Sequence, residues 1–345
     1  MATTERTEAR TAAEILAGTR DLVDPALRTA VDTLPSPVRR IAGYHLGWWD
    51  ERGRPAKADG GKALRPALTL LSAEASGGTA RDALPGAVAV ELVHNFSLLH
   101  DDVMDGDTTR RHRPTAWTVF GANAAILTGD ALLALASDVL TVADNPDPGG
   151  TQRMLAGAVQ DLIAGQLADL VLEERREVTV RECLGMAEGK TAALLACACA
   201  LGATLAGAPP ERVAALRGFG SRLGLAFQAA DDLLGIWGDP TVTGKPVHSD
   251  LGRRKKSLPV VAALSSDTPA ARELADLYHG DGPLEGPDLE RAATLVEQAG
   301  GRTWTHEQAD ALLEDALRLL ATADPVARTG AELTALARRA TRRDH

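Results

Sequence analysis

Two short segments of the sequence concentrate carboxylates beside apolar residues. The first, LLHDDVMDGDTTRRHRPT, covers residues 98–115 and contains Asp101, Asp102 and Asp105. If residues 88–105 form one helix, Asp101 and Asp105 lie one turn apart on the same face, with Asp102 adjacent. Their mutual repulsion predicts a bound cation, and oxygen ligands without histidine or cysteine suit magnesium. The segment therefore indicates a magnesium site.

A second segment, FQAADDLLGIWGDP at residues 227–240, places Gln228, Asp231 and Asp232 on another predicted helix. Two carboxylate clusters across a cavity can hold several magnesium ions. Such ions can grip a diphosphate from both sides and neutralise its charge as it leaves. Diphosphate is therefore the substrate group that the two segments indicate.

Basic residues occur near glycine-rich breaks, where arginine forks and lysine charges would match phosphate oxygens. An exposed acidic helix end, paired with arginines across a loop, accounts for the first segment equally well by itself. The second acidic helix favours the metal site. The basic candidates are Lys62, Arg65, Arg110, Arg111, Lys190, Lys245, Lys255 and Lys256.

The elements that must position these side chains are predicted to be helices. Apolar residues recur at three- and four-residue spacing, alanine and leucine dominate, and aromatic residues make up only 3% of the chain, a pattern typical of long helices rather than strands. No break is long or polar enough for an interdomain linker. We expect an all-α protein, one large helical bundle domain over residues 1–345 around a central apolar cavity, with residues 1–10 mobile.

Composition excludes several classes of protein. The 37 basic and 47 acidic residues give a net charge of -10, which disfavours nucleic acid as a partner. Three cysteines without disulfide or metal-clip spacing, and an N-terminus without a signal peptide, predict a cytoplasmic location. The most apolar window, residues 191–210, is interrupted by glycines and closed by two prolines, so we expect no transmembrane segment.

At this point the segments resemble, in order over about residues 58–262, those of the trans-prenyl diphosphate synthases. The matching segments are GGKALRP, HNFSLLHDDVMDGDTTRRHRPT, GQLADL, KTAALL and FQAADDLLGIWGDPTVTGKP. The resemblance implies the helical isoprenoid synthase fold and a homodimer. It also implies head-to-tail condensation of isopentenyl diphosphate with allylic diphosphates, assisted by three magnesium ions.

Carried over position by position, the resemblance assigns roles to residues of this chain. Asp101, Asp105 and Asp231 are the expected direct magnesium ligands, with Asp102 and Asp232 beside them. The diphosphate of isopentenyl diphosphate is expected to bind Lys62, Arg65, His94 and Arg111. The allylic diphosphate is expected to bind Arg110, Lys190 and Lys245. The reacting centre is expected to be lined by Gln166, Asp169, Thr191 and Gln228.

Gly235 departs from the family pattern, which has a third aspartate at this position of the second motif. Asp239 lies eight residues beyond Asp231, about 12 Å along an unbroken helix, too far to take its place without a bend. We therefore expect altered magnesium affinity without loss of function.

The residues before the first motif resemble those of geranylgeranyl diphosphate synthases, in which a bulky side chain floors the cavity for the growing product. Phe96 is bulky and Ser97 is small. Phe96 lies about 7.5 Å along the helix from Asp101, which predicts a twenty-carbon product. An ordinary core aromatic is the alternative for Phe96. For the whole chain, the alternatives are a terpene cyclase of related fold, a non-catalytic partner subunit and a diphosphate-binding module.

Overall fold

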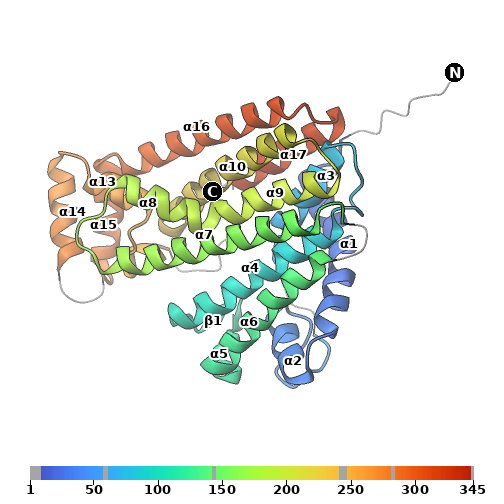
Figure 1. The fold of residues 1–345 in the computed structure, drawn as a ribbon. Coiled ribbons are helices and arrows are strands. Elements are labelled where there is room, and N and C mark those ends of the chain that lie inside the picture. The colour runs from blue at the N-terminus through green and yellow to red at the C-terminus, as the bar shows by residue number, and fades with distance from the viewer. Residues whose placement is uncertain (1–8, 57–60, 142–144, 241–246, 281–283, 343–345) are drawn as a thin grey trace. The chain divides into compact units, whose positions relative to one another are not determined.

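A computed structural model of the chain describes residues 9–56, 61–141, 145–240, 247–280 and 284–342. These residues are mostly helical (Figure 1), which confirms the all-α prediction. One two-residue hairpin is the only sheet among the described residues, formed by β1 (Thr109–Arg110) and β2 (Arg113–Pro114).

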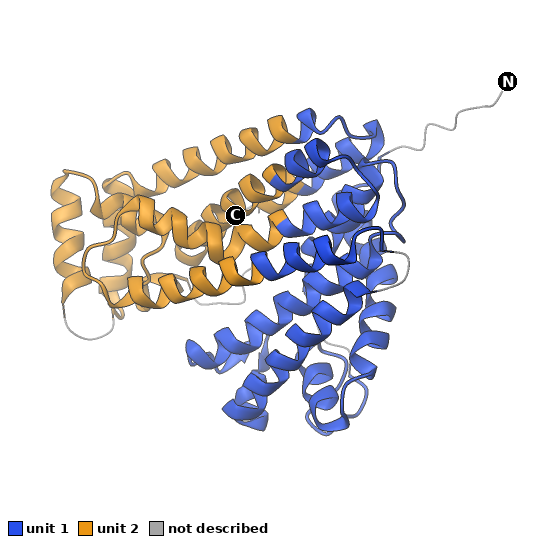
Figure 2. Cartoon of the chain, in the orientation of Figure 1, with its two compact units in different colours: residues 1–157, 197–217, 320–336 blue, residues 158–196, 218–319, 337–345 orange. Residues whose placement is uncertain are grey.

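The chain divides into two compact units (Figure 2). Unit 1 comprises residues 1–157, 197–217 and 320–336, and unit 2 comprises residues 158–196, 218–319 and 337–345. The organisation as a single domain stays a prediction. Several helices contribute residues to both units: α7 (Pro148–Glu174), α9 (Ala193–Leu205), α10 (Pro210–Trp237), α16 (Gly301–Thr322) and α17 (Ala327–Thr341).

Unit 1 is built around α4 (Leu84–Met104), whose residues 87–93 are all buried. In Figure 1, α4 lies beside α6, and these two helices are in extensive contact. The remaining helices that precede α7 in the chain are α1 (Ala12–Asp32), α2 (Ser36–His45), α3 (Leu64–Ala75), α5 (Ala116–Phe120), α6 (Ala122–Asp138) and η1 (Val139–Thr141).

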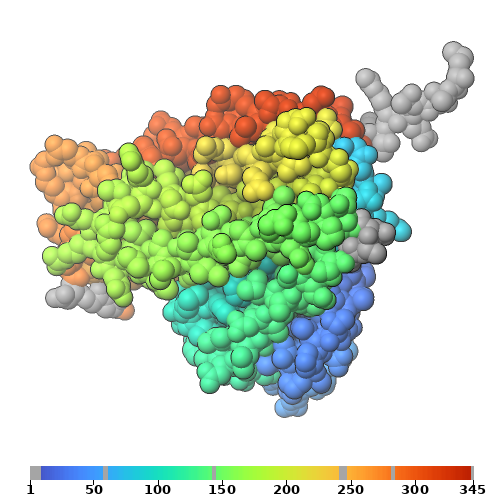
Figure 3. All heavy atoms as spheres, viewed as in Figure 1, coloured from blue at the N-terminus to red at the C-terminus, as the bar shows by residue number. Residues whose placement is uncertain are grey.

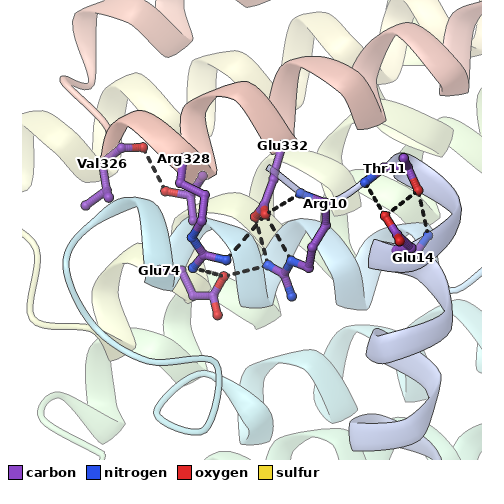
Figure 4. Close-up of polar contacts among 8 residues, drawn as sticks. Arg10, Thr11, Glu14, Glu74, Val326, Arg328 and Glu332 are labelled. Carbon is purple, nitrogen blue, oxygen red and sulfur yellow. Dashed lines mark hydrogen bonds and ion pairs between the residues drawn. The ribbon is translucent and has the colours of Figure 1, made fainter. Parts of the chain in front are cut away.

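A partly buried ion-pair network joins Arg10 to α17 in unit 1 (Figure 4). The Glu332 side chain is fully buried. It accepts hydrogen bonds from Arg10 N at 3.0 Å, Arg10 Nη2 at 2.8 Å and Arg328 Nη1 at 3.3 Å. Arg10 Nη2 also contacts Glu74 of α3 at 2.9 Å. Of residues 1–10, expected to be mobile, residues 1–8 lie outside the described residues, whereas Arg10 is held in place by these bonds.

Unit 2 contains a turn of π-helix that interrupts regular α-helix. It lies at η2 (Glu188–Ala192), between α8 (Val180–Ala187) and α9. Thr179 caps α8, and its side chain and that of Glu182 bond reciprocally to each other's backbone. The remaining elements are α12 (Ser249–Gly252), α13 (Leu258–Leu264), α14 (Pro269–His279) and α15 (Pro287–Gln298).

Three helical segments are long and apolar enough to cross a membrane, judged by length and composition. They are Ala122–Thr141, Pro148–Glu174 and Val180–Leu205. The last of these includes most of residues 191–210, the window that we expected not to span a membrane. The absence of a transmembrane segment stays a prediction.

Candidate active site

Gly61, shortly before α3, lies close to the β1–β2 hairpin. Gly61 has a φ of 97°, and a Cβ atom built there would lie 2.6 Å from Arg111 Nη2. Arg20 of α1 donates a hydrogen bond from Nη2 to the Gly61 carbonyl oxygen at 2.8 Å. A glycine is required both by the positive φ and by the nearby guanidinium. Lys62 follows Gly61 directly, and Arg65 lies in the first turn of α3.

The hairpin turn presents adjacent arginines. Arg111 and His112 have φ values of 51° and 60°, which is typical of a type I′ turn. Arg113 has a structural role, because it donates to the carbonyl oxygens of Tyr44 and Trp49 at 3.2 Å and 3.0 Å. Of the three arginines in the first acidic segment, Arg110 and Arg111 therefore remain candidates for binding an anion.

His94 lies in the positive field of unit 1. Burial, followed by the charges of Arg65, Arg111 and Arg110, holds its pKa well below the ordinary value. The imidazole is therefore neutral at physiological pH and can donate one hydrogen bond. The structure thus gathers four of the predicted diphosphate-binding residues in unit 1, namely Arg65, His94, Arg110 and Arg111.

Polar groups behind this basic region were not recognised in the sequence. Asn95 donates from Nδ2 to the Glu91 carbonyl oxygen at 2.8 Å and to Glu91 Oε1 at 3.1 Å. His45 of α2 interacts with Asn95, and burial together with Arg111 and Arg110 lowers its pKa to about 3. No spacing in the sequence predicts this contact, because His45 and Asn95 come from helices fifty residues apart in the chain.

The first acidic cluster lies at the C-terminal end of α4. Asp101 is partly buried and Asp105 is exposed, whereas Asp102 is buried and its Oδ1 accepts a hydrogen bond from Arg110 Nε at 2.6 Å. Burial raises the pKa of Asp102 although Arg110 opposes this effect. Asp102 Oδ2 is buried without a hydrogen-bond partner among the described residues. This donor set fits a hard cation such as magnesium.

The geometry by itself does not identify a metal centre. Within the described ranges, no group of three or more histidine, cysteine, aspartate or glutamate side chains is spaced to hold an ion. The magnesium-ligand roles of Asp101, Asp105 and Asp231 therefore stay predictions.

In unit 2, two glycines allow α7 and the π-helical turn η2 to cross at backbone contact distance. A Cβ atom on Gly165 would lie 2.1 Å from the Lys190 backbone nitrogen, and one on Gly189 would lie 2.6 Å from the Asp161 carbonyl oxygen. Single π-turns inside helices are frequent at functional sites. Here the turn carries Lys190 and Thr191, and the crossing places it against the predicted site residues of α7.

The crossing brings the predicted reacting-centre residues together. Lys190 Nζ lies 2.5 Å from Asp169 Oδ2. Thr191 donates from Oγ1 to Gln228 Oε1 at 2.6 Å, and Gln228 Nε2 donates to Asp232 Oδ1 at 2.8 Å.

Gln166, one turn before Asp169, is 7% exposed, and neither its Oε1 nor its Nε2 has a hydrogen-bond partner among the described residues. A buried amide that makes no hydrogen bond is costly. A ligand that bonded to this amide would remove that cost.

Asp232 has partners within the protein. Its Oδ2 accepts from the backbone nitrogen of Leu258, at the start of α13, at 2.9 Å. Burial raises its pKa to about 6 although Lys255 opposes the shift. Lys255 Nζ lies 3.9 Å from Asp232 Oδ1 and 4.0 Å from Asp250 Oδ2. The neighbouring Asp231 is exposed at the surface of α10.

The space beside Gly235 is filled by a carboxylate from another helix. A Cβ atom on Gly235 would lie 2.2 Å from Asp250 Oδ2 and 2.5 Å from Asp250 Cγ. Ser249 Oγ, next to Asp250 on α12, donates to the Gly235 carbonyl oxygen at 3.3 Å. Sequence reasoning found a missing aspartate at position 235 but did not recognise that Asp250 lies against it.

Phe96 and Ser97 were predicted to set product length, and Lys245 was predicted to bind the allylic diphosphate. Phe96 is 5% exposed on α4, and Ser97 donates from Oγ to the His94 carbonyl oxygen at 2.8 Å. Lys245 lies outside the described residues.

Comparison with known proteins identifies the family. The sequence model of the family described as polyprenyl synthetase matches residues 52–296. A (2E,6E)-farnesyl diphosphate synthase of Mycobacterium tuberculosis is 48% identical over 326 residues, which cover 94% of this chain and 91% of that protein. A geranylgeranyl diphosphate synthase of the same organism is 50% identical over 297 residues, covering 86% and 85%.

Solved structures agree. The crystal structure of a polyprenyl synthetase from Streptomyces coelicolor A3(2) matches with a TM-score of 0.90 and 49% identity, over 95% of this chain and 99% of that one. The resemblance recognised from the aspartate-rich segments is confirmed. The chain belongs to the polyprenyl synthetase family and is a prenyltransferase with the all-α isoprenoid synthase fold.

Proposed function

We propose that this chain condenses isopentenyl diphosphate head-to-tail with allylic diphosphates in a magnesium-dependent reaction, and that its main product is the twenty-carbon geranylgeranyl diphosphate. One observation carries the proposal. Each unit combines an aspartate-rich helix with buried or half-buried basic side chains, at Asp102 and Arg110 in unit 1 and at Asp232 and Lys255 in unit 2.

In unit 1, the basic region suits the diphosphate of isopentenyl diphosphate. Arg65 and Arg111 supply permanent charge, and neutral His94 supplies a hydrogen-bond donor. Lys62 completes this set. Arg110, whose Nε donates to Asp102 Oδ1, would bind the allylic diphosphate.

In unit 2, Lys190 would provide charge for the allylic diphosphate beside Asp169. The oxygens and dipoles of Gln166, Thr191 and Gln228 would stabilise the allylic cation once its diphosphate leaves. When bound at Asp101, Asp105 and Asp231, magnesium would neutralise the charge of the departing diphosphate.

Phe96 supports the twenty-carbon product. It is buried on α4, five residues before Asp101, where a growing chain directed along the helix would meet its ring. The relatives that match this chain include both a farnesyl and a geranylgeranyl diphosphate synthase, so the names of relatives support either length. Phe96→Ala should lengthen the product. A product distribution identical to that of the wild type would favour an ordinary core role for Phe96.

The terpene cyclase alternative is disfavoured by the residues themselves. A cyclase needs no site for isopentenyl diphosphate, whereas unit 1 gathers Arg65, His94 and Arg111. The departure at Gly235, which motivated that alternative, has a packing explanation in Asp250.

An incubation experiment tests the proposal. Purified protein with magnesium and labelled isopentenyl diphosphate is given five-, ten- or fifteen-carbon allylic diphosphates, and the products are sized by mass spectrometry. Twenty-carbon diphosphate from all three primers is expected. A fifteen-carbon end product would refute the assigned length, and hydrocarbon or alcohol without incorporation of isopentenyl diphosphate would establish a cyclase.

We also propose a cytoplasmic homodimer. Ile163, Leu167 and Val171 form a stripe on α7 and are 50%, 62% and 48% exposed. This part of α7, yellow-green in Figure 3, is open on the face drawn there. Exposed apolar side chains at four-residue spacing are typical of a helix that packs against a partner. Light scattering of Leu167→Lys should show a monomer where the wild type shows a dimer.

A further inference from the structure

The ring of Phe96 is held by His100, one helical turn later on α4. The two ring centroids lie 4.8 Å apart at an interplanar angle of 67°, an edge-to-face arrangement that favours one relative orientation. Since Phe96 is 5% exposed and the His100 side chain is 22% exposed, His100 lies on the more accessible side of the pair.

His100 is in turn bonded to α6. Its Nε2 lies 3.0 Å from the Ile126 carbonyl oxygen. Because a carbonyl oxygen only accepts, Nε2 carries the hydrogen of this bond. The same nitrogen lies 3.6 Å from Asp130 Oδ1. The orientation of the imidazole is therefore determined by a helix that does not contain Phe96.

Gly129 of α6 makes this arrangement possible. A Cβ atom at position 129 would lie 2.4 Å from His100 Nε2, 2.5 Å from His100 Cδ2 and 3.5 Å from Phe96 Cδ2. Any other residue would occupy the volume of the imidazole. The backbone of α6 thus forms one wall of the space that holds both rings.

We propose that His100, seated against Gly129 and bonded to the Ile126 carbonyl oxygen, is a positioning residue that keeps the Phe96 ring in place and thereby limits product length. The inference rests on the proposed function, with Phe96 as the floor for the growing chain. It adds that a bulky side chain at position 96 is not sufficient by itself to limit product length. Without the imidazole, the Phe96 ring gains a space into which it can rotate, and the floor recedes.

Product analysis of His100→Ala tests the proposal. The ratio of products longer than twenty carbons to the twenty-carbon product should rise about two- to tenfold, the range expected from loss of one aromatic contact. The double variant His100→Ala/Phe96→Ala should give the same distribution as Phe96→Ala, because His100 acts only through Phe96. His100→Phe, which keeps a ring against Phe96 but loses the bond to the Ile126 carbonyl oxygen, should give a product distribution between those of the wild type and His100→Ala.

His100 is next to Asp101, a predicted magnesium ligand, so a loss of all activity in His100→Ala would leave no product to size. A second variant therefore leaves both residues unchanged. Gly129→Ala places a methyl group within the imidazole and must displace it, so longer products should appear. Gly157→Ala, whose added methyl meets no atom within 4 Å, is the matched control and should leave product lengths unchanged.

The outcomes separate the two proposals. A wild-type protein that forms no prenyl diphosphate would overturn the proposed function and this inference with it. If the wild type and Phe96→Ala differ in product length but His100→Ala and Gly129→Ala both match the wild type, only the positioning role fails. A double variant whose products exceed those of Phe96→Ala would also overturn that role, since His100 would then act independently.

Discussion

Substitution of Gly235 by alanine should destabilise the protein, although glycine-to-alanine changes inside helices usually stabilise. Gly235 lies in the last turn of α10. The added Cβ atom would lie 2.2 Å from Asp250 Oδ2 and 2.5 Å from Asp250 Cγ, well inside van der Waals contact. Because both atoms are too close, the whole carboxylate must move.

The magnitude follows from what the carboxylate would lose. Asp250 is 8% exposed, and its Oδ2 lies 4.0 Å from Lys255 Nζ. Overpacking of a buried site costs about 1–3 kcal/mol, more than the gain of about 0.5–1 kcal/mol that alanine brings to a helix interior. We therefore expect a net loss in the free energy of unfolding.

Urea denaturation followed by circular dichroism measures the change. Gly185→Ala is the matched control, because Gly185 is also helical, also lies in unit 2 and has no atom within 4 Å of the position that an added methyl group would take. The control should raise the urea midpoint while Gly235→Ala lowers it. In Gly235→Ala/Asp250→Ala the clash is absent, so the two substitutions should show a coupling energy of about 1 kcal/mol or more. A Gly235→Ala midpoint equal to or above that of the wild type would refute the reasoning.

Three further predictions concern other parts of the molecule. Arg10→Ala removes hydrogen-bond donors from buried Glu332 and should lower the free energy of unfolding by about 2–3 kcal/mol at neutral pH. This loss is smaller than that for a fully buried ion pair because Arg10 is partly exposed. Since these bonds lower the pKa of Glu332 from 4.5, the difference in free energy of unfolding between Arg10→Ala and the wild type should shrink as the pH falls below 4.5. A difference that urea denaturation shows to be independent of pH would contradict this prediction. His45 has its pKa lowered to about 3, so the unfolded state binds a proton that the folded state does not as pH falls below 6.5. The wild type should therefore lose stability over this range, and His45→Asn should show a shallower pH dependence in thermal unfolding. Gly165→Ala must push α7 away from the Lys190 backbone and should lower prenyltransferase activity at least about tenfold, as small misplacements of catalytic groups can, whereas Gly157→Ala should keep wild-type activity.

The helical class and the local motifs follow from the sequence alone. The three- and four-residue spacing of apolar side chains predicts helices because it matches the helical period. The helix predicted over residues 88–105 corresponds closely to α4, Leu84–Met104. The aspartates at positions 101, 102 and 105 are neighbours through one helical turn, so their proximity needed no tertiary structure.

Residue spacing did not predict the π-helical turn or the glycine crossing. The segments GQLADL and KTAALL were recognised by resemblance, but the backbone contact between Gly165 and Lys190 depends on how α7 and η2 pack. A glycine in a predicted helix can mark a cap, a flexible position or a close approach of another backbone. Only the packing distinguishes them.

Tertiary structure alone decided which groups lie beside the motifs. Gly235 suggested a missing carboxylate, yet Asp250 fills that space from a helix fifteen residues later. Arg20 bonds to the Gly61 carbonyl oxygen and Gly129 makes room for the His100 imidazole, and both contacts join residues still farther apart in the chain. Periodicity reports only neighbours within one element, because side-chain direction repeats with the helix. Contacts between elements depend on packing angles and side-chain volumes, which no local pattern of residues encodes.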